Sequence, residues 1–236
     1  MDTDKNQSGK RKLYIAIAGH FSQNDLMFVQ SMMALVIKPP MSLTFGWCTD
    51  PSVERARNVL TANFLESDCT HILFIDTDIG FSCGDVERIA SHDEGVVGGM
   101  YPIKTVEPTI KWCGNGVKGA GVGASGLQEV ACVGTGFLCI AKWTFEKILA
   151  TDRKQIRYFQ DWPPYREEFA FWRQEVREVD GKRRFLTEDW NFCYRWRELG
   201  GRCYADTQVV LQHAGRAVWP LALQKAEGRM QNAENK

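Results

Sequence analysis

The sequence predicts an α/β protein built on a parallel, doubly wound sheet. Apolar runs alternate with segments of helical periodicity through the first hundred residues, which is the pattern of strands covered by helices. The strongest strand signal, His71–Ile75 (HILFI), is apolar on both faces, as is typical of strands in the middle of parallel sheets. The length of 236 residues is compatible with one large domain.

The first half of the chain supplies the alternating elements. Ser52 is a suitable N-cap for the helix that follows it, and Pro39-Pro40 ends the helix before them. The expected strands are Leu13–Ala18, Ser42–Trp47, His71–Ile75 and Gly95–Gly98, and the expected helices are Asn24–Val36, Ser52–Ser67 and Gly84–Ser91.

The second half is less regular. Gly114–Gly126 holds six glycines and is interpreted as a surface turn or as a mobile flap over a ligand. Asp180-Gly181 is a hairpin turn signal, and Arg157–Trp172, rich in aromatic residues and broken by prolines, is expected to be a loop. The remaining expected elements are two apolar stretches flanking Gly134-Thr135-Gly136, helices at Trp143–Leu149 and Glu188–Leu199, and a strand at Val209–Gln212.

Composition excludes several classes of protein. The 29 basic residues balance 29 acidic residues, which argues against a general nucleic-acid binder. No apolar stretch is long enough for membrane insertion, and the polar start lacks the apolar region of a signal peptide. We therefore expect a cytoplasmic protein (in the host cytoplasm, if it is viral) with reduced cysteines. Its expected parts are a disordered segment at 1–12, one domain at 13–226 and a polar tail at 227–236.

Two carboxylates follow the strongest strand directly. Asp76 and Asp78 leave the sheet at the edge where such sheets bind ligands, and their spacing of two points both side chains the same way. Converging carboxylates repel unless a cation lies between them, and hard divalent ions prefer such oxygen ligands. The alternative is an Asp-rich turn in which Asp78 is a local cap.

A second acidic pair, Glu188-Asp189, begins a predicted helix after Thr187. Acids in a first turn are favoured by the helix dipole, and Thr187 can cap the helix, so a structural role is one interpretation. Phe192 and Trp196 define the core-facing side, and the two acids border it. An acid held there is a candidate general base.

Other candidate side chains are further apart in the sequence. His213, at the end of the last strand, could complete the coordination of an ion, and one His with carboxylates suits Mn²⁺ slightly better than Mg²⁺; a lone His is also often structural. Arg57 and Asn58 lie on the second helix, where an Arg could bind a diphosphate or face solvent. The aromatic residues that could stack on sugars or pack under a loop are Trp162, Tyr165, Phe169 and Trp172.

The order of these motifs resembles a known group. ERARNVLTANFL, THILFIDTDIGF, VVGGMYPIK, GTGFLCI and TEDWNFCYRWRELGG precede a strand that ends in His213. This is similar to the GT-A glycosyltransferases, closest to the small family-2-like enzymes of bacteria and large DNA viruses, over Leu13 to Gly215. The resemblance implies a Rossmann-like mixed sheet flanked by helices, with a smaller antiparallel sheet on the acceptor side. It also implies metal-dependent sugar transfer, with Mn²⁺ or Mg²⁺, from a UDP- or GDP-sugar to a hydroxyl of a glycan or protein-linked acceptor.

The same resemblance implies roles for individual residues. Asp78 and His213 would bind the metal directly, and Asp76 would contact the ribose or the metal and its water shell. Asp189, or Glu188, would be the base that deprotonates the acceptor, which predicts inversion at the anomeric carbon. The residues expected around the nucleotide and donor sugar are Ala18, Gly19, His20, Arg57, Asn58, Asp76, Thr77, Lys104, Gly134, Thr135 and Gly136.

Two other functions are compatible with part of this pattern. Phosphatases of the haloacid-dehalogenase type also place Asp-x-Asp after an apolar strand, but they carry Thr or Val where this chain has Gly80, and their motif lies near the chain start. A non-catalytic domain that binds a nucleotide sugar or a glycan is the other alternative. A dinucleotide-dependent oxidoreductase is disfavoured because no GxGxxG follows the first strand.

Overall fold

The structure is a computed structural model that describes residues 11–19, 25–104, 111–161, 163 and 165–215, together with the backbone of 219–220. His20, Trp162, residues 1–10 and the tail at 227–236 therefore lie outside the described residues. Lys12, expected in the disordered segment, instead begins the first strand, and Arg11 donates to the carbonyl of His92 at 2.5 Å.

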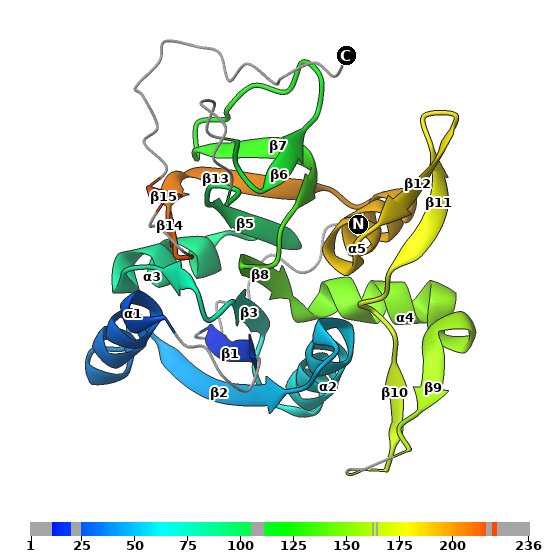
Figure 1. The fold of residues 1–236 in the computed structure, drawn as a ribbon, viewed down its shortest axis with the longest axis horizontal. Coiled ribbons are helices and arrows are strands. Elements are labelled where there is room, and N and C mark those ends of the chain that lie inside the picture. The colour runs from blue at the N-terminus through cyan, green and yellow to red at the C-terminus, as the bar shows by residue number, and fades with distance from the viewer. Residues whose placement is uncertain are drawn as a thin grey trace, which may run out of the picture.

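An eight-stranded sheet forms the centre of the molecule, in the order β2-β1-β3-β8-β5-β13-β7-β6 (Figure 1). β1, β2 and β3 run parallel, but β8 is antiparallel to both of its neighbours, so the sheet is mixed where the alternation of elements predicted a parallel one. Burial on both faces requires cover above and below a strand and does not fix the direction of its neighbour. The strands are β1 (Lys12–Gly19), β2 (Ser42–Thr49), β3 (His71–Ile75), β5 (Val96–Met100), β6 (Gly114–Gly116), β7 (Leu127–Val133), β8 (Phe137–Ala141) and β13 (Cys203–Val210).

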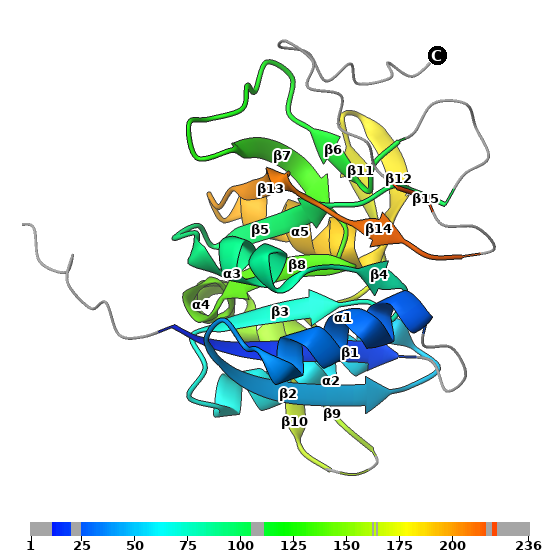
Figure 2. The same ribbon diagram turned by 90° about the vertical axis from the view of Figure 1, so that its left-hand side faces the viewer.

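Helices cover both faces of this sheet, and each face has its own core (Figure 2). α1 (Leu26–Ile37) and α3 (Cys83–Ser91) bury Phe28, Leu35 and Ile89 on one face. On the other face lie α2 (Val53–Glu66), α4 (Lys142–Ile156) and α5 (Glu188–Glu198), which bury Phe64, Phe145 and Phe192. The layered α/β architecture expected from the sequence is confirmed.

Side-chain caps begin three of the helices. Ser52 accepts from the Arg55 amide, as its position predicted, and Ser82 forms a reciprocal capping box with Asp85. Asp25 accepts from the Met27 amide at 2.9 Å. Thr187 precedes α5 but makes no cap bond, contrary to expectation, and its hydroxyl donates to the Asp189 carboxylate.

Small antiparallel sheets complete the fold. Asp180 and Gly181, at φ of 52° and 71°, turn β11 (Glu175–Val179) into β12 (Lys182–Leu186), as predicted. The prediction of a loop at Arg157–Trp172 is wrong. This segment contains an antiparallel hairpin of β9 (Arg157–Phe159) and β10 (Glu167–Phe169). The third small sheet joins β4 (Ile79–Gly80), β14 (Gln212–His213) and β15 (Trp219–Pro220).

Within the described residues, no helix has the length and apolar character needed to cross a membrane. All eight cysteines are described, and each carries a free thiol.

Candidate active site

The Asp76-Thr77-Asp78 turn is fixed to two other segments at the end of β3. The Asp76 amide donates to the Gly136 carbonyl at 3.0 Å, and the Ala214 amide donates to the Asp78 carbonyl at 2.8 Å. The next two residues, Ile79 and Gly80, pair antiparallel with His213 and Gln212. These backbone bonds bring His213 beside the turn, although 134 residues separate it from Ile79 along the chain (213 minus 79).

A carboxylate oxygen of Asp78 and a ring nitrogen of His213 face one another. The distance between Asp78 Oδ1 and His213 Nε2 is 3.6 Å. A carbonyl can only accept, so the 2.7 Å contact of His213 Nδ1 with the Pro102 carbonyl places a proton on Nδ1. In the neutral ring Nε2 turns a lone pair toward the carboxylate, whereas in the protonated ring Nε2 carries a proton that interacts favourably with the Asp78 carboxylate. Asp78 Oδ1 is buried and has no hydrogen-bond partner in the described part of the chain.

This geometry fits a divalent cation. With the neutral ring, a cation can bridge the carboxylate oxygen and the imidazole nitrogen, and a ligating His commonly donates its other N–H to a carbonyl, as here. Within the described residues, no group of three His, Cys, Asp or Glu side chains converges as a ligand set. A cation held by Asp78 and His213 would therefore take its other ligands from substrate oxygens and water.

Lys104 supplies the positive charge next to Asp78 in this structure. Its ammonium forms an ion pair with Asp78 Oδ2. Burial raises the pKa of the Asp78 carboxyl, but the interactions with His213 and Lys104 outweigh it, so the net pKa is below the ordinary value. The Asp78 carboxyl is thus ionised at neutral pH.

Asp76 belongs to a different charge cluster. Arg57 of α2 is buried, and one guanidinium nitrogen lies 3.0 Å from Asp76 Oδ1 while another bonds Glu188 of α5. Burial lowers the pKa of Arg57, but the surrounding carboxylates raise it further, and the guanidinium remains charged. A solvent-facing role for Arg57 is excluded. Asp76 and Asp78, two residues apart, are neutralised by different partners.

Asp189 is the half-buried acid of the pair on α5. Its Oδ1 accepts from the Thr187 hydroxyl at 2.5 Å and from the Trp190 amide at 2.8 Å. Burial first, and the charge of neighbouring Glu188 second, raise the pKa of Asp189 to about 6. Desolvation and a like charge are the usual means by which proteins tune a base toward neutral pH.

The Gly134-Thr135-Gly136 turn connects β7 to β8 and lies against Tyr101. The Gly136 amide donates to the Tyr101 hydroxyl at 2.9 Å, and a Cβ on Gly136 would lie only 2.7 Å from the Tyr101 ring. Thr135 is buried. The same turn supplies the carbonyl that accepts from Asp76, so the close approach of Tyr101 helps to fix the acidic turn.

The remaining expected residues fall into two groups. Gly19 lies beside the acidic turn, because a Cβ there would be 3.6 Å from the Thr77 methyl group, and Ala18 precedes it in β1. Asn58 does not reach the site: it is buried, and its amide both donates to and accepts from the backbone of Trp172, at 2.9 and 3.0 Å. Trp172 is also buried, stacked on Phe192, so its role is packing.

Sequence reasoning missed Tyr101 and Pro102. Tyr101 packs edge-on against the His213 ring, with centroids 5.3 Å apart, and Pro102 holds Nδ1 of that ring. Their position directly after the apolar run Val96–Met100, at the same edge of the sheet as Asp76, is the signal that could have identified them.

Comparison with known proteins shows the fold. No family model and no curated protein sequence matches the chain. Among solved structures, A197 from STIV is similar with a TM-score of 0.53 and 17% identity, over 95% of this chain and 100% of that one. GalNAc-T7, crystallised with UDP, GalNAc and Mn²⁺, is similar with a TM-score of 0.52 and 8% identity, over 88% of this chain.

The chain adopts the GT-A fold. The resemblance drawn from the motif order is thereby confirmed at the level of architecture. This chain spans 44% of the GalNAc-T7 structure, less than half of its length. At such identities the similarity concerns fold alone.

Proposed function

We propose that this protein is a metal-dependent glycosyltransferase that moves a sugar from a nucleoside-diphosphate sugar to an acceptor hydroxyl. The observation that carries the proposal is the pairing of Asp78 Oδ1 with His213 Nε2 at 3.6 Å, at the end of β3 in a GT-A fold. GalNAc-T7, which shares this architecture, was crystallised with UDP, GalNAc and Mn²⁺.

Asp78 and His213 would hold the divalent ion, Mn²⁺ or Mg²⁺, in this proposal. Bound there with the donor, such an ion supplies Lewis-acid stabilisation of the diphosphate that leaves as the glycosidic bond breaks. Lys104, whose ammonium lies beside Asp78, is placed to add positive charge next to the same diphosphate.

Asp76, Gly19 and Thr77 would line the nucleoside end of the donor. Asp76 is oriented by Arg57 but its side chain remains 34% exposed, so the carboxylate can still accept a hydrogen bond from a ribose hydroxyl. Gly19 lets β1 end close to Thr77, where a larger side chain would occupy space needed by the donor.

Asp189 would accept the proton of the acceptor hydroxyl as that oxygen attacks the anomeric carbon. Its Oδ1 is occupied by Thr187 and Trp190, which fixes the carboxylate and leaves Oδ2 for the acceptor. Glu188 is held by Arg57 in a buried pair, so its proposed role is to position Arg57 and raise the basicity of Asp189. A separate base of this kind predicts inversion of configuration.

A thermal-shift panel of UDP- and GDP-sugars with and without Mn²⁺ tests the donor site. A ligand that binds only the folded state raises its stability, so one donor is expected to raise Tm selectively in the presence of Mn²⁺. Asp78→Ala should abolish the Mn²⁺-dependent part of that shift. Glu87→Ala, an exposed carboxylate on α3, is the matched control and should leave the shift unchanged.

Three outcomes would contradict the proposal. An unchanged Mn²⁺-dependent shift in Asp78→Ala would show that the cation binds elsewhere. Binding of a nucleotide sugar without turnover across a panel of acceptors would favour a non-catalytic binder. Hydrolysis of p-nitrophenyl phosphate, without sugar transfer, would favour a phosphatase.

A further inference from the structure

The end strand β2 leaves one side of the sheet open. β2 pairs with β1 along its whole length, from Lys12↔Ser42 to Gly19↔Thr49, and it has no partner on its other side among the described residues. Its outer edge therefore presents a row of backbone N–H and C=O groups over eight residues. The opposite end of the sheet differs, because β6 is only three residues long.

Neither β2 nor the adjacent helix α1 contains a charged residue. The strand reads SLTFGWCT and the helix reads LMFVQSMMALVI. Soluble proteins usually protect open sheet edges with short strands, charged side chains, prolines or bulges. β2 has none of these within its bounds, so its edge is open to pairing with a further strand.

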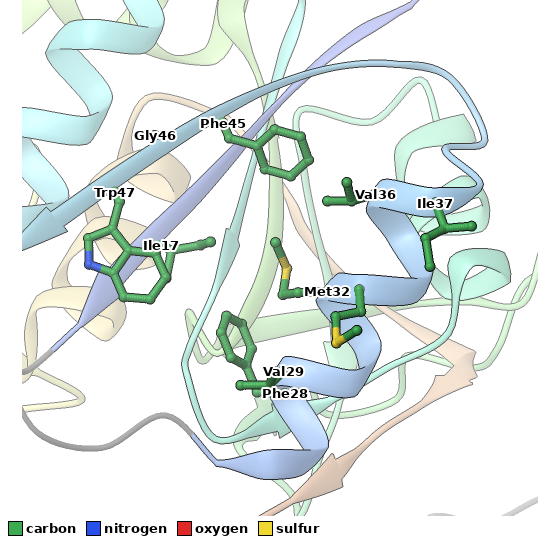
Figure 3. Close-up of a pocket in the computed structure, with 10 residues that line it drawn as sticks. Ile17, Phe28, Val29, Met32, Val36, Ile37, Phe45, Gly46 and Trp47 are labelled. Carbon is green, nitrogen blue, oxygen red and sulfur yellow. The ribbon is translucent and has the colours of Figure 1, made fainter.

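An apolar groove of about 600 Å³ runs between α1 and β2 (Figure 3). Phe45 and Trp47 lie in register with Ile15 and Ile17, whose side chains belong to the core beneath α1, so both aromatic rings point to the α1 face. They are 45% and 50% exposed, and Ile37 at the end of α1 is 79% exposed. The groove is lined by Met32, Val36, Ile37, Phe45 and Trp47, among others.

We propose that this surface binds a second copy of the same chain, with the two β2 strands pairing antiparallel across a twofold axis. Such an axis brings the same edge and the same groove of each copy together, so that each offers the other its free N–H and C=O groups. The absence of charge on β2 and α1 means that the two copies meet without like-charge repulsion.

The exposed apolar area is adequate for a stable dimer. Met33, Val36, Ile37, Phe45 and Trp47 are between 45% and 79% exposed. Together they present roughly 600 Å² per copy, most of the ~800 Å² per partner that a standard interface buries. The paired strand edges would contribute the remainder. This inference is independent of the proposed enzymatic activity.

A membrane surface is a less suitable occupant of the same groove. Free backbone N–H and C=O groups of an edge strand would lose their hydrogen bonds to water on entering hydrocarbon, whereas a second strand replaces those bonds. Helices that lie in the membrane interface usually carry Lys or Arg on their polar face, and α1 has neither.

The mass of the full chain in solution tests the proposal. Size-exclusion chromatography with light scattering, at about 50 µM and thus well above the Kd of a micromolar interface, should give twice the chain mass of 26.8 kDa. Phe45→Arg and Ile37→Arg should each give the mass of one chain, because an unpaired charge would then be buried in an apolar interface. Phe185→Arg, 64% exposed on β12, which lies on the other side of the molecule from β2 (Figure 1), is the matched control and should remain dimeric.

Hydrogen exchange provides a second readout of strand pairing. The outward-facing amides of β2 should exchange slowly in the wild-type chain and at least tenfold faster in Ile37→Arg, whose substitution lies outside the strand. If Phe45→Arg fails to fold by circular dichroism, Ile37→Arg decides the question, since that side chain is largely exposed and tolerates charge.

Three results would overturn the proposal. One is a wild-type chain that is monomeric at this concentration. Another is a dimer that persists in both arginine variants. The last is a monomer that cosediments with phosphatidylcholine vesicles and loses this binding in Ile37→Arg, which would assign the groove to a membrane.

Discussion

Arg57 is expected to stabilise the fold because it neutralises two carboxylates from distant parts of the chain. Its side chain is 5% exposed, that of Glu188 is 10% exposed, and that of Asp76 is 34% exposed. Arg57→Met would leave Glu188 charged and buried without its partner, a change that typically costs about 3–5 kcal/mol. Asp76 keeps part of its hydration, so we expect the free energy of unfolding to fall by an amount near the lower end of this range, about 3 kcal/mol.

Urea denaturation at pH 7.5 measures this loss. The control is Arg157→Met, which removes an exposed ion pair with Glu167 whose members are 55% and 57% exposed, and which should cost less than about 1 kcal/mol. The double variant Arg57→Met with Glu188→Met should recover at least half of the loss, because removing both charges leaves no unpaired buried ion. A single variant no less stable than the control, or a double variant with no recovery, would refute this reasoning.

Three further predictions concern the candidate site. The pKa of Asp189 is raised to about 6, so deprotonation of this carboxyl lowers the stability of the fold as pH rises from about 4 through 6. Asp189→Asn removes that charge and should therefore raise Tm at pH 8 and not at pH 4. The same variant should abolish the proposed transfer. The proposed transfer rate of the wild-type chain should rise with pH through about 6, and a rate that is flat from pH 5 to 7 would exclude Asp189 as the base. Gly136→Ala should lower the free energy of unfolding by about 1–3 kcal/mol in urea denaturation, because its Cβ would overlap Tyr101. The control is Gly121→Ala, where a Cβ meets nothing within 4 Å. Equal losses of stability in the two variants would contradict the packing argument.

The local elements could be predicted because their signals lie within short segments. The apolar strand His71–Ile75, the cap at Ser52 and the turn at Asp180-Gly181 each depend on neighbouring residues, and each is present in the structure. The hairpin within Arg157–Trp172 could not be predicted, because its strands are three residues long, too short for an alternating pattern to show.

The partners within the candidate site depend on contacts between distant residues. Arg57 and Glu188 are 131 residues apart, and Lys104 is 26 residues from Asp78, so no local spacing indicates either pair. Asn58 shows that proximity in the sequence is also insufficient. It adjoins Arg57 in the sequence, yet the turn of the helix directs its side chain to the backbone of Trp172. The order of the motifs predicted which segments of the chain lie together at the site. Which side chains contact one another could be determined only from the structure.

Product analysis of the transfer reaction by proton NMR tests the central claim most directly. With the donor found by thermal shift, Mn²⁺ and an acceptor sugar, we predict consumption of the donor, release of the nucleoside diphosphate and a product of inverted anomeric configuration. Asp78→Ala should remove this activity, and Glu87→Ala should retain it. A donor that binds and is never consumed, or an activity that is unchanged in Asp78→Ala, would contradict the account.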